Sequence, residues 1–557
     1  MRAKGIALVA TLALMVLISL LVFGTFFRTQ IELWVTRNDT TSVQAFYAAE
    51  AGLQKYKAAL FQYYIWREEE IRRGGGAGCY SSLVEGIDLG RSGTLIRFTN
   101  NQLVLADGES VLDADGRPIG SYTVTLIKDA QDGQLFTLVS QGRSSGARAT
   151  VQATFRLSNT DYLEQAIFAG TGQSNKWLNG SATIRGGIYI VGDRNKPDDY
   201  VISGTGDFSL YNDYNLYDTQ EYGNIASWVE ESYRKVDDLC ASLRVQYGKV
   251  SVGGSVTIGK PGNKVKGVFV GRGSQDITGQ NVDVCQNNKG VCTETMGPFD
   301  LSDPPPFPTL DAKLDSEACG AYPTWRQCLQ AKAALRIQRI GNTVTLLQPL
   351  EATLNPSCLA AMTSGTLTLS TNGLDCTFTR LDGTRGGFRY TYAGGQGVLE
   401  LYGDVVLEGL NVVFDKPTEY KASSGGKRSA TLAVLAKNGQ GGNLNLNGNL
   451  LPNTSHGLFP SHTLGLVAEG NIYQRGQYVM APVYAGRTFR VVKDNVLFGS
   501  VISNEFCTTS AGNQTSCNAG QKAEVVYIRI PQENRPVLLP SLKGGKPVFQ
   551  VLSYERR

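Results

Sequence analysis

The hydrophobic pattern divides this chain into an apolar and amphipathic N-terminal part and a much longer part made of short strand-like segments. Residues Ile6 to Phe27 form an uncharged run of 22 positions. As a helix rising about 1.5 Å per residue, this run would extend about 33 Å, enough to cross a bilayer. Apolar residues then recur at mostly three, four, seven or eight residue steps as far as Leu60, which is typical of a helix with one apolar stripe. Since the first glycine cluster begins at Gly74, one long helix is predicted over 6–73.

Five residues precede this apolar run, and they include Arg2 and Lys4. The positive-inside rule places this leader in the cytoplasm and the chain after Arg28 on the other side of the inner membrane. A secretory signal peptide would have a shorter apolar region followed by a cleavage site, whereas here the small residue Gly5 stands before the apolar region. A single-pass segment over 6–27 is therefore predicted, with the bulk of the chain in the periplasm.

Residues 74–165 predict an antiparallel sheet. Their apolar runs alternate with turn formers such as Asp107–Gly108 and Asp115–Gly116, which is the pattern of a meander. A long helix followed by such a sheet gives a first domain.

Residues 166–520 have a different pattern, in which short Val, Ile and Leu runs are joined by Gly, Asn, Asp and Ser. Each run is too short to close a core alone, but a stack of similar turns would bury a continuous apolar seam, so a β-solenoid is predicted. The period is irregular, and a β-sandwich or a propeller remains the alternative. Two stretches with helical spacing, 228–246 and 324–340, interrupt the strands.

The C-terminal segment 521–557 contains two more predicted strands, Val525–Ile530 and Pro547–Tyr554. We expect both to return to the sheet of 74–165, so that the solenoid is an insertion into the first domain. A tandem arrangement with an unrelated tail is the alternative.

The 64 glycines, the low share of charged residues, 18%, and the many short apolar runs indicate extended β structure with frequent turns. Together with the helix over 6–73, this predicts a mainly β protein with one long N-terminal helix. At 557 residues, two or three domains are expected. The net charge of +4 is too small to indicate a partner.

Cysteines occur in close sequential pairs on the side of the membrane where oxidation is possible, which predicts local disulfides. The expected pairs are Cys285 with Cys292, Cys319 with Cys328, Cys358 with Cys376, and Cys507 with Cys517. Cys79 and Cys240 stay unassigned. No cofactor is expected, and neither is a metal site, since the cysteine spacings fit no zinc template and the chain has only two histidines.

The N-terminal residues resemble the PilX-type minor pilins of type IV pili. The resemblance is carried by the basic leader ending in Gly5, the apolar start at Ile6, Arg37–Asn38, and the AFYAAEAG segment over 45–52. It implies cleavage by a prepilin peptidase after Gly5, a pilin fold, and packing of the helix among other pilins. Most pilins carry glutamate where this chain has Ala10, and an uncharged residue there resembles subunits placed at the tip of the fibre.

The size, the solenoid-like middle and the local disulfides together resemble large competence minor pilins. This resemblance implies capture of extracellular DNA at the pilus tip in natural transformation, with the help of another minor pilin. Such a protein would be stored in the inner membrane and, after assembly, displayed at the cell surface.

Basic residues that would neutralise DNA phosphates without reading bases fall into three groups. The first is a stripe on the predicted helix over 324–340, the second a loop, and the third a dispersed set. In that order the residues are Arg326, Lys332, Arg336 and Arg339; Lys427 and Arg428; and Lys260, Lys264, Lys266 and Arg272. Each group also fits a solvated face.

Two other function classes remain open at this point. One is a minor pilin that primes assembly or adheres to a surface without binding DNA. The other is a polysaccharide-acting β-helix enzyme, for which the candidate carboxylates are Asp193, Asp198, Asp199, Asp207, Asp213 and Asp218. Spacing alone does not bring those carboxylates together, and the chain contains no GxSxG or HExxH motif, so no catalytic residue is expected.

Overall fold

The computed structural model divides the chain into two compact units. Unit 1 comprises 1–64, 83–157 and 549–557, and unit 2 comprises 65–82 and 158–548. The residues described are 2–73, 86–87, 89–90, 96–129, 135–158, 161–174, 182–203, 208–253, 255–279, 282, 285, 290–301, 304–314, 318–349, 353–380, 383–492, 494–509, 523–540 and 548–556.

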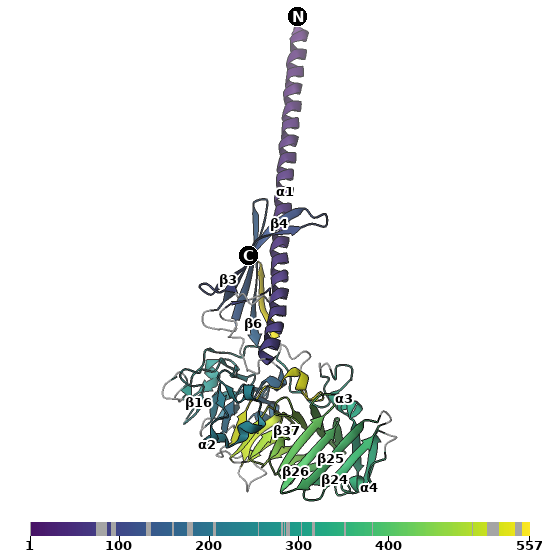
Figure 1. Cartoon of the computed structure of the whole chain (residues 1–557). Helices are drawn as coiled ribbons and strands as arrows, with labels where there is room; N and C mark the ends of the chain where they lie inside the picture. Colours follow the sequence, from purple (N-terminus) through teal and green to yellow (C-terminus); the bar gives the residue numbers. More distant parts are fainter. Residues whose placement is uncertain are drawn as a thin grey trace. The chain divides into compact units, whose positions relative to one another are not determined.

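Helix α1 (Arg2–Arg73) is continuous, as the sequence predicts (Figure 1). An 18-residue stretch of it has a mean hydropathy of 2.5 and no buried residue, so the helix is long and apolar enough to cross a membrane. Burial begins at Ala45 and continues through Ala48, Ala49, Leu53 and Leu60. The second half of the helix therefore packs against protein through one face.

The sheet of unit 1 is a five-stranded sheet in the order β3-β4-β5-β6-β41. Its strands are β3 (Gln102–Leu112), β4 (Pro118–Lys128), β5 (Leu135–Ser144), β6 (Ala147–Ser158) and β41 (Val548–Arg556), and a separate pair is formed by β1 (Gly86–Ile87) and β2 (Ile96–Arg97). The first four strands pair antiparallel in chain order, which is the predicted meander. Figure 1 shows the C-terminal strand beside them.

Small residues let α1 lie directly on this sheet. A Cβ added at Gly52 of α1 would lie 2.7 Å from both Tyr122 of β4 and Ser140 of β5. Within the AFYAAEAG segment, the small residues Ala45, Ala48, Ala49 and Gly52 are buried and face the sheet, while Tyr47 is exposed.

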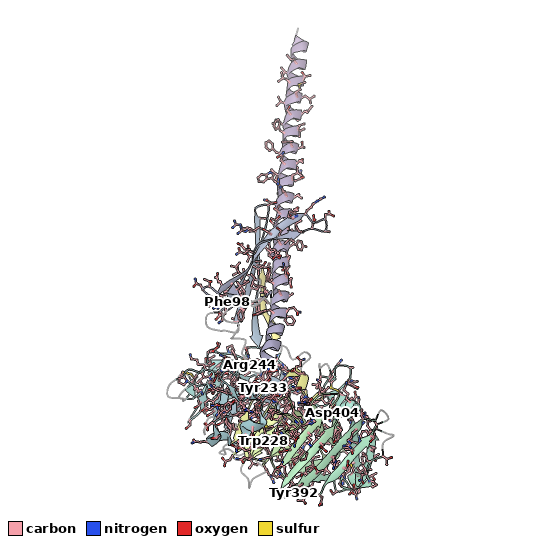
Figure 2. All side chains as sticks on the ribbon, in the orientation of Figure 1. Phe98, Trp228, Tyr233, Arg244, Tyr392 and Asp404 are labelled. Carbon is pink, nitrogen blue, oxygen red and sulfur yellow. A yellow bond between two sulfur atoms is a disulfide. The ribbon has the colours of Figure 1, made fainter. Side chains whose placement is uncertain are left out.

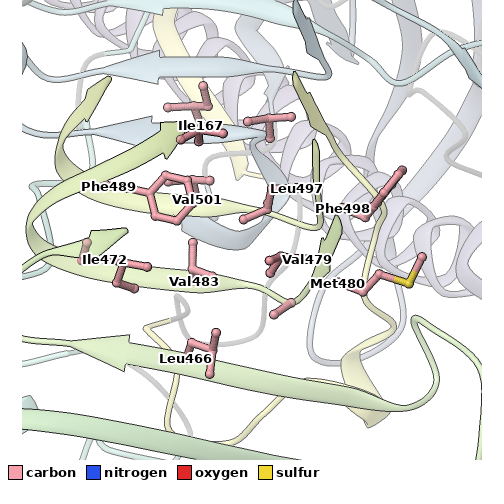
Figure 3. Packing of buried hydrophobic residues seen from close by; sticks show 14 of the residues in the cluster. Ile167, Leu466, Ile472, Val479, Met480, Val483, Phe489, Leu497, Phe498 and Val501 are labelled. Carbon is pink, nitrogen blue, oxygen red and sulfur yellow. The ribbon is translucent and has the colours of Figure 1, made fainter. Parts of the chain in front are cut away.

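Unit 2 is built from parallel ladders of short strands. Ladder 1 runs, in spatial order, through β21 (Leu335–Ile340), β27 (Val405–Glu408), β30 (Ser429–Lys437), β34 (Thr463–Ala468), β37 (Val483–Val492), β39 (Val501–Thr509), β7 (Ile167–Ala169), β9 (Ile188–Ile190), β14 (Ser242–Val245), β17 (Gly267–Val270) and β20 (Met296–Gly297). Apolar residues stack along it. Figure 3 shows one column, in which Leu466 is followed by Val483, Val501 and Ile167.

Two shorter ladders form a second face of unit 2. The longer of them, ladder 2, contains β23 (Thr366–Leu369), β28 (Asn411–Phe414), β32 (Leu444–Leu446) and β35 (Ile472–Gln474), and it continues through the C-terminal ends of β37 and β39. The other contains β10 (Tyr200–Ser203), β15 (Lys249–Ser251) and β18 (Ile277–Thr278). Stacked asparagines stabilise the turns beside ladder 2, because Asn411 accepts hydrogen bonds from Asn443 and Asn443 accepts from Asn471.

Ladder 3 forms the remaining face. Its order is β24 (Leu374–Thr379), β25 (Arg385–Ala393), β26 (Gln396–Tyr402), β29 (Thr418–Ser423), β33 (Leu450–Pro452), β36 (Tyr478–Met480), β38 (Asn495–Phe498), β40 (Ala523–Val526), β8 (Ala182–Arg185), β11 (Ser209–Tyr211), β16 (Thr257–Ile258) and β19 (Gly290–Val291). The β24–β25–β26 segment is antiparallel and ends the ladder, and Figure 1 shows these strands side by side.

The chain enters this stack in the middle. Strands β7 to β20 extend the ladders in one direction, and the chain then restarts at the opposite end with β21. The last strands, β39 and β40, come back beside the first strands, β7 and β8. We call this join between the two halves the seam.

The connection between β20 and β21, described over 304–314 and 318–334, covers the outer face of ladder 1. Its buried residues Leu310, Trp325 and Leu329 pack in one cluster with Phe168 and Tyr484. The Trp325 ring contacts Tyr484 edge-on at 4.6 Å. Because of this cover, inner strands of ladder 1 such as β27, β34 and β7 are buried on both faces.

The structure confirms a mainly β protein with one long helix, and it corrects three predictions. The predicted helix over 324–340 is shorter: α3 (Trp325–Lys332) ends at the extended residue Ala333, and β21 follows. Residues 228–246 contain short 3-10 turns and the strands β13 (Lys235–Val236) and β14 instead of a helix. Strand β40 pairs with β38 and β8, so of the two C-terminal strands only β41 lies in the sheet of unit 1.

Disulfide bonds join Cys285 to Cys292, Cys319 to Cys328, and Cys358 to Cys376. Cys507 is also disulfide-bonded, while Cys517 and Cys79 lie outside the described residues. Cys240 is half-buried just before β14.

Candidate nucleic-acid interface

The predicted basic stripe is absent, because its residues lie on two different elements. Arg326 on α3 donates to Asp311 at 2.8 Å and to Glu469 at 2.8 and 2.9 Å. Lys332 is exposed at the end of the same helix. Arg336 and Arg339 lie on β21, three residues apart, so their side chains leave opposite faces of the strand.

Arg336 is held by a buried carboxylate. Its Nε donates to Glu408, whose side chain is 2% exposed, at 2.5 Å. Burial acts to raise the pKa of Glu408, but the hydrogen bonds from Arg336, Gln338 and Gln330 hold it below its ordinary value. Arg339 donates to the carbonyl of Thr363 and to Gln440. Both arginines therefore have structural partners.

Most of the dispersed set is also paired. Lys260 bonds to Asp213 at 2.5 Å, Lys266 contacts Asp238 and Glu294, and Arg272 contacts Asp276 and Asp198. Lys264 is exposed. The same contacts place Asp198 and Asp213 in ion pairs, while Asp218 caps a short helix, α2 (Thr219–Tyr222).

One corner of unit 2 carries cations that, unlike Arg326, Arg336 and most of the dispersed set, have no carboxylate partner among the described residues. At this corner the turns between ladders 3 and 1 meet the end of α3, near the terminal strands β21 and β24. Lys332, Arg380 and Arg385 line the cavity at this corner, and Lys427 and Arg428 follow in the loop that begins at Ser423. We call these five cations the basic corner. Within the part of the chain that the structure describes, none of these five forms a salt bridge with a carboxylate.

A cavity of about 430 Å³ opens at this corner. It is lined by Lys332, Ala333, Ala334, Arg380, Thr384, Arg385, Tyr402, Gly403, Asp404 and 423–426. Lys427 and Arg428 continue the loop that supplies Ser423 to Gly426. The Arg385 guanidinium lies over the Tyr402 ring at 5.0 Å and donates to its hydroxyl at 3.1 Å.

Asp404 forms the polar wall of this cavity and is labelled beside the region of α3 in Figure 2. Its carboxylate accepts from the backbone N–H of Thr431 at 2.7 Å and from the Ser424 hydroxyl at 3.0 Å. Its side chain is buried, and this burial raises the pKa of Asp404 against the lowering effect of both hydrogen bonds. The cavity thus combines cations and one buried carboxylate.

Four residues that line this cavity were not among the predicted site residues: Arg380, Arg385, Tyr402 and Asp404. A local signal existed for the two arginines, since 380–389 holds three arginines among glycines and threonines, which is typical of an exposed basic turn. For Asp404 no local signal exists, because its neighbours in space come from strands far apart in the sequence.

Comparisons with known proteins identify the family of this chain. Neither a scan of protein-family models nor a search of curated proteins gives a match. Among solved structures, the chain is similar to the crystal structure of the competence-associated pilin ComZ from Thermus thermophilus. The two share 72% identity with a TM-score of 0.77, over 93% of this chain and 97% of that chain. This chain therefore belongs to the ComZ family of competence-associated pilins.

Proposed function

We propose that this chain is a PilX-type minor pilin at or near the tip of a type IV pilus, and that unit 2 is a β-solenoid that receives extracellular DNA in natural transformation. The family membership supports the pilin and competence parts of this proposal. The observation that carries the DNA part is the basic corner, where Lys332, Arg380 and Arg385 line one cavity and two more cations follow in the adjoining loop. None of these five cations forms a salt bridge with a carboxylate of the described chain. Cations already neutralised by carboxylates, such as Arg326 and Arg336, have little to offer a phosphate backbone.

The apolar half of α1 gives the proposed route to the fibre. We place it in the inner membrane first, with residues 1–5 cytoplasmic and removed by the prepilin peptidase after Gly5. The helix from Ile6 then leaves the lipid and packs among other pilins, and unit 2 reaches the cell surface. Ala10 supports a place at the tip, beside another minor pilin, because it offers no carboxylate for pairing with a neighbouring subunit.

DNA binding is tested with the full-length protein in detergent micelles and a labelled random-sequence duplex, over a range of salt concentrations. Affinity should fall linearly with the logarithm of the salt concentration. Replacing Lys332, Lys427 and Arg428 with glutamate should weaken binding and reduce the slope by about one for each phosphate that is no longer neutralised. The matched control replaces Lys313, Arg475 and Arg487, three exposed cations outside the basic corner, with glutamate.

An equal loss of affinity in the control variant would mean that net charge rather than the basic corner drives binding. No binding by the unmodified protein would leave a pilin that primes assembly or adheres to surfaces. In that case deletion of the gene would still reduce the number of pili, and the basic corner would have no effect on transformation.

A further inference from the structure

The cavity at the basic corner has two chemically opposite sides. Lys332, Arg380 and Arg385 supply positive charge, and Asp404 supplies a carboxylate that is 6% exposed. A carboxylate repels a simple anion such as inorganic phosphate but accepts hydrogen bonds from N–H or O–H groups. The lining therefore suits a ligand that carries an anionic group and a hydrogen-bond donor a few ångströms apart.

The size and shape of the cavity restrict the class of ligand further. At about 430 Å³ it lies in the range of small-molecule sites, which is about 300–1,000 Å³. Gly425 and Gly426 have positive φ, and a side chain there would meet nothing within 4 Å, so the loop leaves the cavity open. Tyr402 and Arg385 provide an aromatic ring and a planar guanidinium, both of which stack on nucleic-acid bases.

We propose that this cavity takes one unpaired nucleotide of the incoming DNA. In this arrangement Lys332 and Arg380 bind its phosphate, Arg385 and Tyr402 contact the base, and Asp404 accepts a hydrogen bond from an amino group of the base. A base inside a duplex cannot reach the cavity, because its Watson–Crick edge is paired. The site therefore selects single strands, frayed ends and overhangs, and this inference rests on the proposed function in DNA reception.

The test compares fluorescein-labelled (dC)20 with a blunt 20-base-pair duplex, using full-length protein in micelles. Cytosine is chosen because its N4 amino group is a donor that aspartate recognises. Asp404→Asn should weaken binding of (dC)20 about tenfold and change the duplex Kd less than twofold. Arg380→Ala should also weaken binding of (dC)20 about tenfold, and it should weaken duplex binding less, because the duplex loses one phosphate contact and the single strand loses the site that holds its nucleotide. Arg475→Ala, which removes another exposed turn arginine, should change neither. Unchanged melting temperatures of all three variants show that each variant is folded.

Three results would overturn the proposal while leaving DNA reception intact: equal weakening of both probes, no weakening of either, or weakening of the duplex alone. Displacement of (dC)20 by polygalacturonate at lower concentration than by unlabelled (dC)20 would assign the cavity to an anionic polysaccharide instead. If the unmodified protein bound neither DNA probe, the proposed function itself would fall.

Discussion

Gly142 of β5 lies so close to Ala45 of α1 that a Cβ at Gly142 would stand 2.0 Å from the Ala45 carbonyl oxygen. The same Cβ would lie 2.4 Å from the backbone nitrogen of Ala49. Helix and sheet thus touch through their backbones, which explains why the helix carries alanine at 45, 48 and 49. The small residues of the AFYAAEAG segment set the distance between the two layers.

Gly142→Ala should force α1 and the sheet of unit 1 apart. Overpacking typically costs about 1–3 kcal/mol, and we expect about 3 kcal/mol here because backbone rather than a flexible side chain is in the way. Hydrogen exchange measured by mass spectrometry should show faster exchange in β3 to β6 and no change in unit 2. Gly297→Ala is the control, since a Cβ there meets nothing within 4 Å. Unchanged protection in Gly142→Ala would contradict the close packing.

Arg336→Ala should destabilise unit 2 and leave DNA affinity unchanged in the folded protein. The substitution leaves the buried Glu408 without its cation, and breaking a buried pair in this way costs about 3–5 kcal/mol. Glu408→Gln should cost less, because a neutral amide does not need the cation. Denaturant unfolding measures both variants, and the duplex-binding assay measures affinity. A stable Arg336→Ala protein with weakened DNA binding would restore this arginine as a DNA contact.

The seam depends on a buried ion pair between Arg185 of β8 and Glu524 of β40. The two groups lie 2.5 Å apart, and the Tyr222 hydroxyl donates to the same carboxylate at 2.8 Å. Burial acts to lower the pKa of Arg185, but the charge of Glu524 raises it overall, so the arginine stays ionised. A second set of buried ion pairs lies close to the start of β7, where the Arg535 guanidinium contacts the carboxylates of Asp161 and Glu164.

Glu524→Ala should therefore cost about 3–5 kcal/mol in the free energy of unfolding of unit 2. Faster hydrogen exchange should appear first in β7, β8, β39 and β40, because these strands form the seam. Glu533→Ala removes an exposed glutamate nearby in the sequence and should change stability by no more than about 0.5 kcal/mol. Similar stability of the two variants would show that the seam does not need its charges.

Stability should fall between pH 6.5 and about 4 because of His462. Burial lowers the pKa of His462 to about 4, and its Nε2 accepts a hydrogen bond from the backbone N–H of Ala422 at 2.9 Å. In this interval the unfolded chain takes up a proton that the folded chain does not, so up to about 3 kcal/mol is lost as the pH falls. His462→Gln keeps an acceptor but cannot titrate, and its unfolding free energy should depend less on pH. An identical pH dependence in both proteins would remove His462 as the cause.

Elements whose sequence has one strong hydrophobic period could be predicted correctly. The apolar steps from Ile6 to Leu60 define α1, and Asp115–Gly116 separates β3 from β4 as predicted. The predicted turn at Asp107–Gly108 is wrong, because both residues lie inside β3. The segment after Lys332 was misjudged because two periods compete there. The charged residues at 332, 336 and 339 have helical spacing, whereas Leu335 and Ile337 alternate with polar residues as in a strand. The segment forms a strand because its backbone pairs with β27.

The candidate cavity could not be predicted from local sequence patterns, for a different reason. It forms where Arg380, Thr384 and Arg385 and the turns at 403–404 and 423–426 meet the end of α3. Their proximity depends on which strands pair with one another. A short apolar run in the sequence carries no signal for which other run it pairs with. Neither the entry of the chain at the middle of the stack nor the join of β40 to β8 can be read from any single segment.

That join also sets a condition on how the protein is made. Arg185 is synthesised 339 residues before Glu524, so β7 and β8 emerge long before the strands that cover them. During this interval they present an open strand edge, which is a template for wrong pairing with another chain. A chain that stops before β39 would keep that edge permanently, even with its whole N-terminal half intact. Complete synthesis of β39 and β40 is therefore required to close the open edge of β7 and β8.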